Sequence, residues 1–248
     1  MKKHIPNLIT LLNVLCGCIA TVFAVSNQLE IAAVFVFLGI FFDFFDGMAA
    51  RVLDVKSELG LQLDSLADMI TSGLVPGIVM YQLLLMSHSG GWNSDMAVAA
   101  PAMVTEMPWL PFFGFIITLA SAYRLANFNL DENQISSFVG LPTPANALLI
   151  LSFPLILLYH NNDILNGIIL NQWFLIGTTV LSAYLLNAPI ALFALKFKNW
   201  DFKDNALRYV FICISLVLII TLRYMAIPAI IAFYVLSSLI NGLGKRAG

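Results

Sequence analysis

Four aspartates stand at the ends of two hydrophobic runs, in the stretch FFDFFDGMAARVLDVKSELGLQLDSLADMITSG that covers residues 41–73. They are Asp43, Asp46, Asp64 and Asp68. An acidic side chain at the centre of a bilayer costs about 2.5–3.5 kcal/mol on insertion scales, so such residues usually pair, bind ions or line a cavity. Four carboxylates that converge in a partly dry site repel each other, and hard divalent cations relieve the repulsion. Because every ligand would be an oxygen, the cluster favours Mg²⁺, Mn²⁺ or Ca²⁺ over zinc.

The spacing of these residues predicts two acidic helix faces. Asp43, Asp46, Gly47 and Ala50 follow the pattern i, i+3, i+4, i+7, which puts them on one face at the end of a helix. The last two aspartates are four residues apart and share a face at the start of the next helix. The short connection would bring both faces together at one depth.

The neighbouring residues suit a phosphate-bearing substrate, to which Mg²⁺ often binds jointly with carboxylates. Gly47 has no side chain, so a ligand can approach the backbone beside the second aspartate. Ala50 keeps the same face clear, and Gly60 opens the start of the following helix. Arg51 supplies a cation that can bind phosphate oxygens in a bidentate manner.

The composition indicates an integral membrane protein. Of 248 residues, 60% are hydrophobic and 10% are charged, and the mean hydropathy is +0.90. An ordinary soluble domain has about 25% charged residues, and a membrane-spanning helix needs about 20 mostly apolar residues. We therefore expect an all-α polytopic bundle that forms a single domain over residues 1–248, with a catalytic core of about 1–195 and additional spans within 207–243. The eight expected spans are 8–26, 31–47, 66–87, 109–128, 141–159, 172–195, 207–222 and 226–243.

The distribution of basic residues predicts the orientation in the membrane. With the N-terminus inside, only Arg223 of the 12 basic residues falls on the outer side, and the 88–107 and 160–171 connections contain no Lys or Arg. This is a strong positive-inside bias. We expect both termini and the aspartates at the cytoplasmic face of a plasma membrane. The residues expected inside are Lys2, Lys3, Arg51, Lys56, Arg124, Lys196, Lys198, Lys203, Arg208, Lys245 and Arg246.

The joint pattern resembles the signature of the CDP-alcohol phosphatidyltransferase family. It reads D-x-x-D-G-x-x-A-R-x8-G-x3-D-x3-D and runs without a departure from Asp43 to Asp68. Eight fixed positions make a chance match negligible. The resemblance implies a homodimer of helical bundles that binds two Mg²⁺ or Mn²⁺ ions. It also implies that CDP-diacylglycerol is a substrate.

The resemblance also assigns roles to individual residues. It implies that Asp43, Asp46 and Asp64 bind the metal ions, and that Asp68 contacts metal and is the general base. The residues expected to bind CDP-diacylglycerol are Pro6, Asn7, Thr10, Gly47, Ala50, Arg51, Ser57 and Gly60.

Two further stretches bear on the acceptor alcohol. IPNLITLLNVLCG near the N-terminus and residues 121–147 resemble the integral-membrane phosphatidylserine synthase branch of the family. We therefore expect transfer of the phosphatidyl group to L-serine, with release of CMP. The serine contacts would come from Arg124, Asn127, Asn129 and Thr143, although these residues equally suit a helix end. Glycerol 3-phosphate or an inositol phosphate remains an alternative acceptor, a cation transporter is a rival of a different class, and an inactive scaffold is a third.

Overall fold

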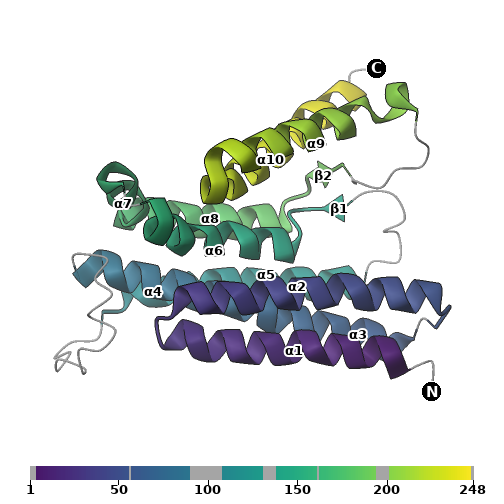
Figure 1. The fold of residues 1–248 in the computed structure, drawn as a ribbon, viewed down its shortest axis with the longest axis horizontal. Helices are drawn as coiled ribbons and strands as arrows, with labels where there is room; N and C mark the ends of the chain where they lie inside the picture. Colours follow the sequence, from purple (N-terminus) through teal and green to yellow (C-terminus); the bar gives the residue numbers. More distant parts are fainter. Residues whose placement is uncertain are drawn as a thin grey trace.

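The computed structural model describes residues 4–55, 57–89, 108–130, 138–160, 162–193 and 201–246, and these residues form a helical membrane bundle (Figure 1). The α-helices are α1 (His4–Val25), α2 (Leu29–Val52), α3 (Glu58–Asp68), α4 (Val75–Ser89), α5 (Ile116–Leu130), α6 (Thr143–His160), α7 (Asp163–Ile169), α8 (Gln172–Asn187), α9 (Phe202–Leu222) and α10 (Ala226–Arg246). Shorter elements are the π-helix η1 (Met69–Leu74), the 3₁₀ segments η3 (Leu110–Phe115) and η4 (Arg223–Met225), and the two-residue strands β1 (Phe138–Val139) and β2 (Ala191–Leu192).

Helices α1 and α2 pack closely because small residues lie between them. Ala20, Ala24, Ala32 and Ala33 are buried, with at most 1% of each residue exposed. Small side chains let helix backbones approach, which is how helices associate where no water drives them together. Viewed as in Figure 1, this pair lies beside α3, α4 and α5, while α6 and α8 form the next layer and α9 and α10 the outermost one.

The third long element is a continuous helix from Glu58 to Ser89 that contains a π-helical turn. The turn follows Asp68 directly and places Thr71 against Gly17 of α1 and Gly39 of α2. A Cβ added at Gly39 would lie only 2.6 Å from Thr71 Cγ2, so both glycines are needed for this close approach. π-Helical turns occur often at functional sites.

Helix boundaries correct two of the predicted ranges. The third helix begins at Glu58, ahead of the predicted span 66–87, because Ser57 caps it by accepting a hydrogen bond from Gly60 N at 3.0 Å. The predicted span 172–195 ends at Asn187, because Pro189 follows and the chain turns into β2.

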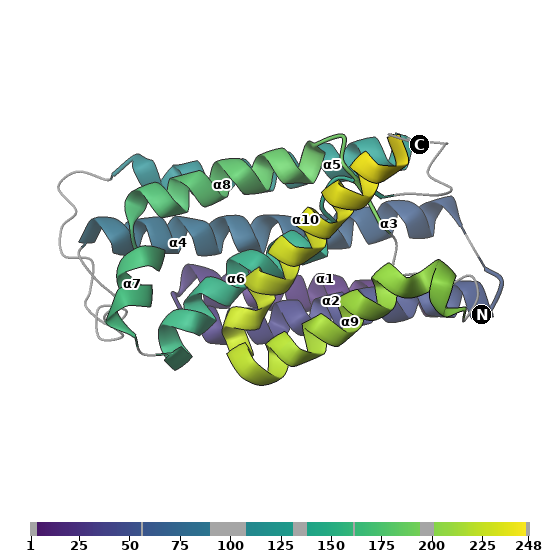
Figure 2. The ribbon, with the colours of Figure 1, turned by 90° about the horizontal axis from the view of Figure 1, so that it is seen from above.

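The expected eight membrane spans are supported only in part. Within the described residues, five helical stretches are long and apolar enough to cross a membrane, and the pair α7 and α8, bent by 57°, makes a possible sixth. Helix α5 falls short because its 15 residues follow a 3₁₀ segment. Helices α9 and α10 belong to one apolar stretch of 36 residues, which folds back at Arg223, where φ is 52° (Figure 2).

Two aromatic contacts attach α9 and α10 to the rest of the bundle. Tyr234 donates a hydrogen bond to Phe193 O at 2.9 Å, and its ring packs against Phe193 and Phe211. At the other end, Tyr224 stacks on Tyr159 with the ring centroids 4.8 Å apart, and Tyr159 donates a hydrogen bond to the carboxylate of Glu30 on α2.

The start of α1 and the end of α10 lie at the same end of the bundle, where α2 ends and α3 begins (Figure 1). This arrangement agrees with the predicted common side for the two termini. Several basic residues used for that prediction lie outside the described residues, as does most of the 88–107 connection. They are Lys2, Lys3, Lys56, Lys196 and Lys198.

Candidate active site

The first three motif aspartates meet between α2 and α3. One carboxylate oxygen from each of Asp43, Asp46 and Asp64 lies within 4.8 Å of the others. Asp46 is buried, with 6% of its surface exposed, while the other two are half-buried. The helix spacing read from the sequence therefore does bring the two acidic faces together.

Asp68 lies one turn deeper along the same helix and outside this group of three. It is close enough to Asp64, Asp46 and Arg124 to interact with them electrostatically. Its Oδ1 atom is buried without a hydrogen-bond partner among the described residues. Its roles as base and as metal contact both stay predictions.

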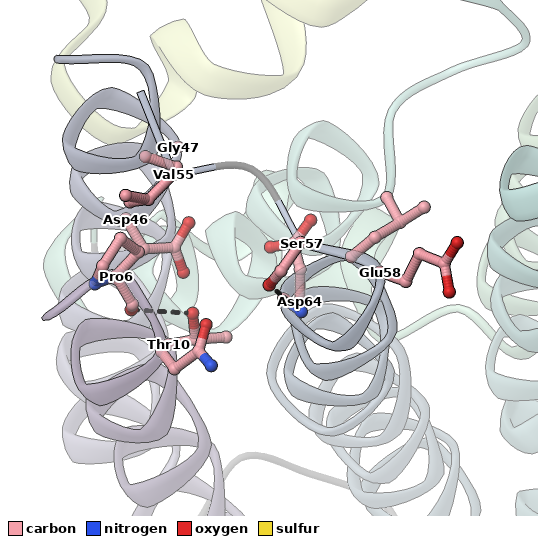
Figure 3. Close-up of a pocket in the computed structure, with 12 residues that line it drawn as sticks. Pro6, Thr10, Asp46, Gly47, Val55, Ser57, Glu58 and Asp64 are labelled. Carbon is pink, nitrogen blue, oxygen red and sulfur yellow. Dashed lines mark hydrogen bonds between the residues drawn. The ribbon is translucent and has the colours of Figure 1, made fainter. Parts of the chain in front are cut away.

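A pocket of about 560 Å³ opens beside the aspartates at the end of the bundle (Figure 3). Asp46 and Thr10 flank one side of it, and Ser57 and Asp64 lie across from them. Its lining comes from the start of α1, the end of α2, the connection after it and the start of α3. The lining residues are Pro6, Asn7, Thr10, Asp46, Gly47, Ala50, Val55, Ser57, Glu58, Gly60, Leu61 and Asp64.

Seven of the eight residues predicted to bind the CDP-lipid line this pocket; the exception is Arg51. The Arg51 side chain is exposed and folds back along α2, where Nε donates a hydrogen bond to Gly47 O at 3.0 Å. This contact holds the guanidinium at the edge of the pocket beside the glycine.

The pocket wall is built around the start of α3. A Cβ at Gly60 would lie 3.1 Å from Ser57 Oγ and 3.3 Å from Asn7 Oδ1, so the glycine lets α1 and the capping serine approach. On α1, Thr10 is buried and donates its hydroxyl to Pro6 O at 3.1 Å. Polar oxygens from two separate helices thus face the space next to the aspartates.

The predicted serine-binding residues have different surroundings in the structure. Arg124 is half-buried and close enough to Asp68 for the two charges to interact. Asn129 instead joins α5 to α3, because its Oδ1 accepts from Ser65 Oγ at 3.0 Å and its Nδ2 donates to Gln62 at 3.4 Å. Within the part of the chain that the structure describes, no hydrogen bond or ion pair connects Asn127 or Thr143 with the aspartates.

Sequence reasoning missed a buried hydrogen bond behind the site. Thr71 of the π-helical turn donates its hydroxyl to Asn13 Oδ1 at 2.7 Å, and both residues are fully buried. The sequence offered one signal for this hydrogen bond: Asn13 and Thr71 are polar residues within otherwise apolar stretches. Sequence reasoning also missed the pocket-lining residues Val55, Glu58 and Leu61, which carry no distinctive pattern.

The donor set fits a divalent metal ion. All converging ligand atoms are carboxylate oxygens, and Asp46 Oδ2 is buried without a hydrogen-bond partner among the described residues. Buried charged oxygens are costly unless they are paired or coordinate a metal. A hard cation would satisfy them and would select against zinc, which prefers nitrogen and sulfur ligands.

The family model for CDP-alcohol phosphatidyltransferase matches residues 3–184 of this chain. The chain belongs to the CDP-alcohol phosphatidyltransferase family. The matched range contains the whole pocket and all four aspartates, and it ends before α9 and α10. The resemblance read from the sequence motif is confirmed.

Similar proteins of this family carry the name CDP-diacylglycerol–serine O-phosphatidyltransferase. The chain is 34% identical to the Bacillus subtilis protein over 157 residues, which cover 61% of this chain and 76% of the relative. It is 28% identical to the protein of Helicobacter pylori strain J99 over 214 residues, 86% of this chain and 81% of the relative. The Methanocaldococcus jannaschii relative is 30% identical over 162 residues, 65% of this chain and 66% of its own.

Proposed function

We propose that this phosphatidyltransferase transfers the phosphatidyl group of CDP-diacylglycerol to L-serine and releases CMP. The observation that carries the proposal is the cluster of Asp43, Asp46 and Asp64 opening into a pocket lined by most of the predicted CDP-lipid contacts. The serine acceptor is supported by the three relatives named above, which share that activity in their names.

In the proposed reaction, the serine hydroxyl oxygen attacks the phosphorus that carries diacylglycerol. The bond from this phosphorus to the bridging oxygen breaks, and CMP leaves with the electron pair. Asp68 accepts the hydroxyl proton, a role that requires hydrogen-bond reach in the bound complex. Its position one helical turn after Asp64, with Asp46 and Asp64 near enough to act on it electrostatically, supports this role.

The chain's own residues would hold the lipid nucleotide in place. Gly47 and Ala50 leave the face of α2 open, and Arg51 at the rim can pair with a phosphate oxygen. Asp43, Asp46 and Asp64 would hold two Mg²⁺ or Mn²⁺ ions, which supply charge neutralisation and alignment of the phosphoryl group when bound.

Phosphate-bearing acceptors such as glycerol 3-phosphate or an inositol phosphate are disfavoured by the scarcity of positive charge. Among the described residues, Arg124 is the basic side chain that faces Asp68, and Arg51 lies at the rim of the nucleotide pocket. A dianionic acceptor would call for more cations. A transport role is disfavoured because the aspartates lie at one end of the bundle rather than midway across it.

We further propose that the enzyme is a homodimer in the plasma membrane, with eight spans and with the site and both termini at the cytoplasmic face. Residues of about 1–195 would form the catalytic core of this single domain, and α9 and α10 would be an addition to it. The positive-inside bias and the common end of the two termini support this orientation.

An acceptor panel tests the reaction. Purified full-length protein in detergent is given CDP-diacylglycerol with serine, glycerol 3-phosphate or inositol phosphate, with and without a chelator, and CMP release is measured. We expect release with serine and Mg²⁺ or Mn²⁺, and none after chelation. Release with glycerol 3-phosphate but not serine would overturn the acceptor, and ion flux without CMP release would favour transport.

A further inference from the structure

A second polar zone lies behind the aspartate cluster, between α5 and the helix that runs from α3 into the π-helical turn. Thr118 of α5 donates a hydrogen bond to Gly73 O at 3.1 Å at one end of this contact. Ser65 donates to Asn129 Oδ1 at 3.0 Å at the other end. The order of these pairs shows that the two elements run antiparallel, and the two bonds fix their register.

Between these fixed points, buried polar atoms lack partners. Ser72 and Ser121 are fully buried, and their hydroxyl oxygens have no hydrogen-bond partner among the described residues. The same holds for Arg124 Nε and Asp68 Oδ1. Because buried polar atoms in native proteins are nearly always paired, this concentration points to a polar occupant.

These four residues belong to the same stretch of the contact between the two elements. Ser121 lies next to the π-helical turn, because a Cβ at Gly73 would be 3.2 Å from Ser121 Cβ. Arg124 follows three residues later on the same face of α5 and interacts electrostatically with Asp68. Ser72 follows Asp68 by four residues and precedes Gly73.

We propose that Ser72, Ser121 and Arg124 form the α5 subsite, which binds the carboxylate of a small hydroxylated acceptor. This inference rests on the proposed function and deepens it. The guanidinium Nε–H and two hydroxyls are donors, which match the acceptor-only oxygens of a carboxylate. Asp68 at the edge of the subsite leaves the acceptor hydroxyl directed toward the aspartate cluster.

The charge of the α5 subsite selects a singly charged group. Arg124 is its one cation, so a carboxylate is balanced where a phosphate dianion is not. The subsite also replaces part of the acceptor contacts read from the sequence, since Asn129 is already occupied with Ser65 and Gln62. Two serines inside apolar helices would therefore set acceptor specificity.

Serine-to-alanine variants test the subsite in the full-length enzyme. For Ser121→Ala and Ser72→Ala, CMP release is measured while serine is varied at saturating CDP-diacylglycerol, and then with the roles reversed. Losing a hydrogen bond to a charged group should raise the KM for serine about 5–30-fold, with the KM for CDP-diacylglycerol unchanged. The Tm should stay level or rise, because the hydroxyl removed has no hydrogen-bond partner among the residues that the structure describes.

Ser238→Ala is the matched control. Ser238 is a buried serine of α10 whose hydroxyl donates to Tyr234 O at 2.7 Å, and its loss should leave both KM values alone. An unchanged serine KM in both subsite variants would overturn the inference and indicate a zone filled by water. A parallel rise in both KM values, or a fall in Tm without a selective rise, would also overturn it.

The design separates this inference from the proposed function. If the wild-type enzyme uses another acceptor and not serine, the proposed function fails, and the same variants are titrated with that acceptor. A selective rise in its KM would then retain the α5 subsite, whereas no rise would remove it.

Discussion

At the scale of single residues, three of the four motif aspartates converge, and the fourth lies apart from them. Asp43, Asp46 and Asp64 converge because the helix repeat places the first two on one face of α2 and the connection brings the third opposite. Asp68 shares its helix face with Asp64 but lies a turn deeper, beside Arg124. Asp68 as the base, and its contact with metal, stay predictions that the variant below tests.

Replacing Asp68 with Asn should abolish most turnover while the protein stays folded. The variant keeps the shape of the side chain but cannot accept a proton, so CMP release should fall about 10²–10⁴-fold. Binding of CDP-diacylglycerol and the Tm should be close to those of the wild type. Asp163→Asn, at an exposed position on α7, is the control, and normal turnover by Asp68→Asn would refute the role as base.

Replacing Gly47 with Ala should affect the substrate rather than the fold. A Cβ there meets Arg51 Nη2 at 3.7 Å, an ordinary contact, so the Tm should not fall. The methyl group would project toward the nucleotide pocket and raise the KM for CDP-diacylglycerol. A thermal melt and a lipid titration check both parts; an unchanged KM would show that substrate does not approach this backbone.

At the scale of elements, the π-helical turn links the site to the packing of three helices. Thr71 touches α1 and α2 at Gly17 and Gly39 and donates to Asn13 Oδ1. Asp68 stands immediately before this turn, so its direction depends on how the turn is packed. The two glycines therefore affect the position of Asp68 without contacting it, because they allow the close packing of the turn that follows it.

Replacing Gly39 with Ala should destabilise the protein and lower its activity together. The added Cβ would lie 2.6 Å from Thr71 Cγ2 and 2.8 Å from Asn13 Oδ1, so η1 must shift. Overpacking of this kind costs about 1–3 kcal/mol. Gly177→Ala on α8, where the added Cβ has no atom of another described part of the chain within 4 Å, should leave the Tm and CMP release unchanged. A Gly39→Ala protein with wild-type Tm would contradict this account of the packing.

At the scale of the whole molecule, the acidic site lies near the end of α2 and the start of α3, toward the end of the bundle where α1 starts and α10 ends (Figure 1). Its carboxylates repel one another in the absence of a cation, so the metal should stabilise the fold as well as the reaction. Helices α9 and α10 attach through aromatic contacts away from this cluster and lie beyond the range matched by the family model.

Adding Mg²⁺ or Mn²⁺ to chelator-treated protein should raise the Tm. A ligand that binds only the folded state stabilises it by about 2.7 kcal/mol at a concentration 100 times its Kd. Asp64→Asn should reduce this rise, because it removes one of the three converging carboxylates. A metal-induced shift of the same size in Asp64→Asn would place the ion elsewhere.

The sequence by itself determined the membrane class, the family and the acidic site, because these depend on local spacing. Apolar length and the helix repeat act within one element, so the faces of α2 and α3 could be read directly. The number of spans did not follow in the same way. Residues 109–128 are apolar enough to suggest a span, yet helix α5 has 15 residues and is too short to cross a membrane by itself.

Only the tertiary structure decided which polar residues work together across helices. Asn129 and Arg124 lie close in sequence, yet the first is bonded to α3 and the second faces Asp68. Ser72 and Ser121 carry no motif, and their importance emerges only where two packed helices leave their hydroxyls buried without a partner among the described residues. Such pairings depend on the register between helices. Side-chain packing sets this register, so a local sequence pattern does not predict it.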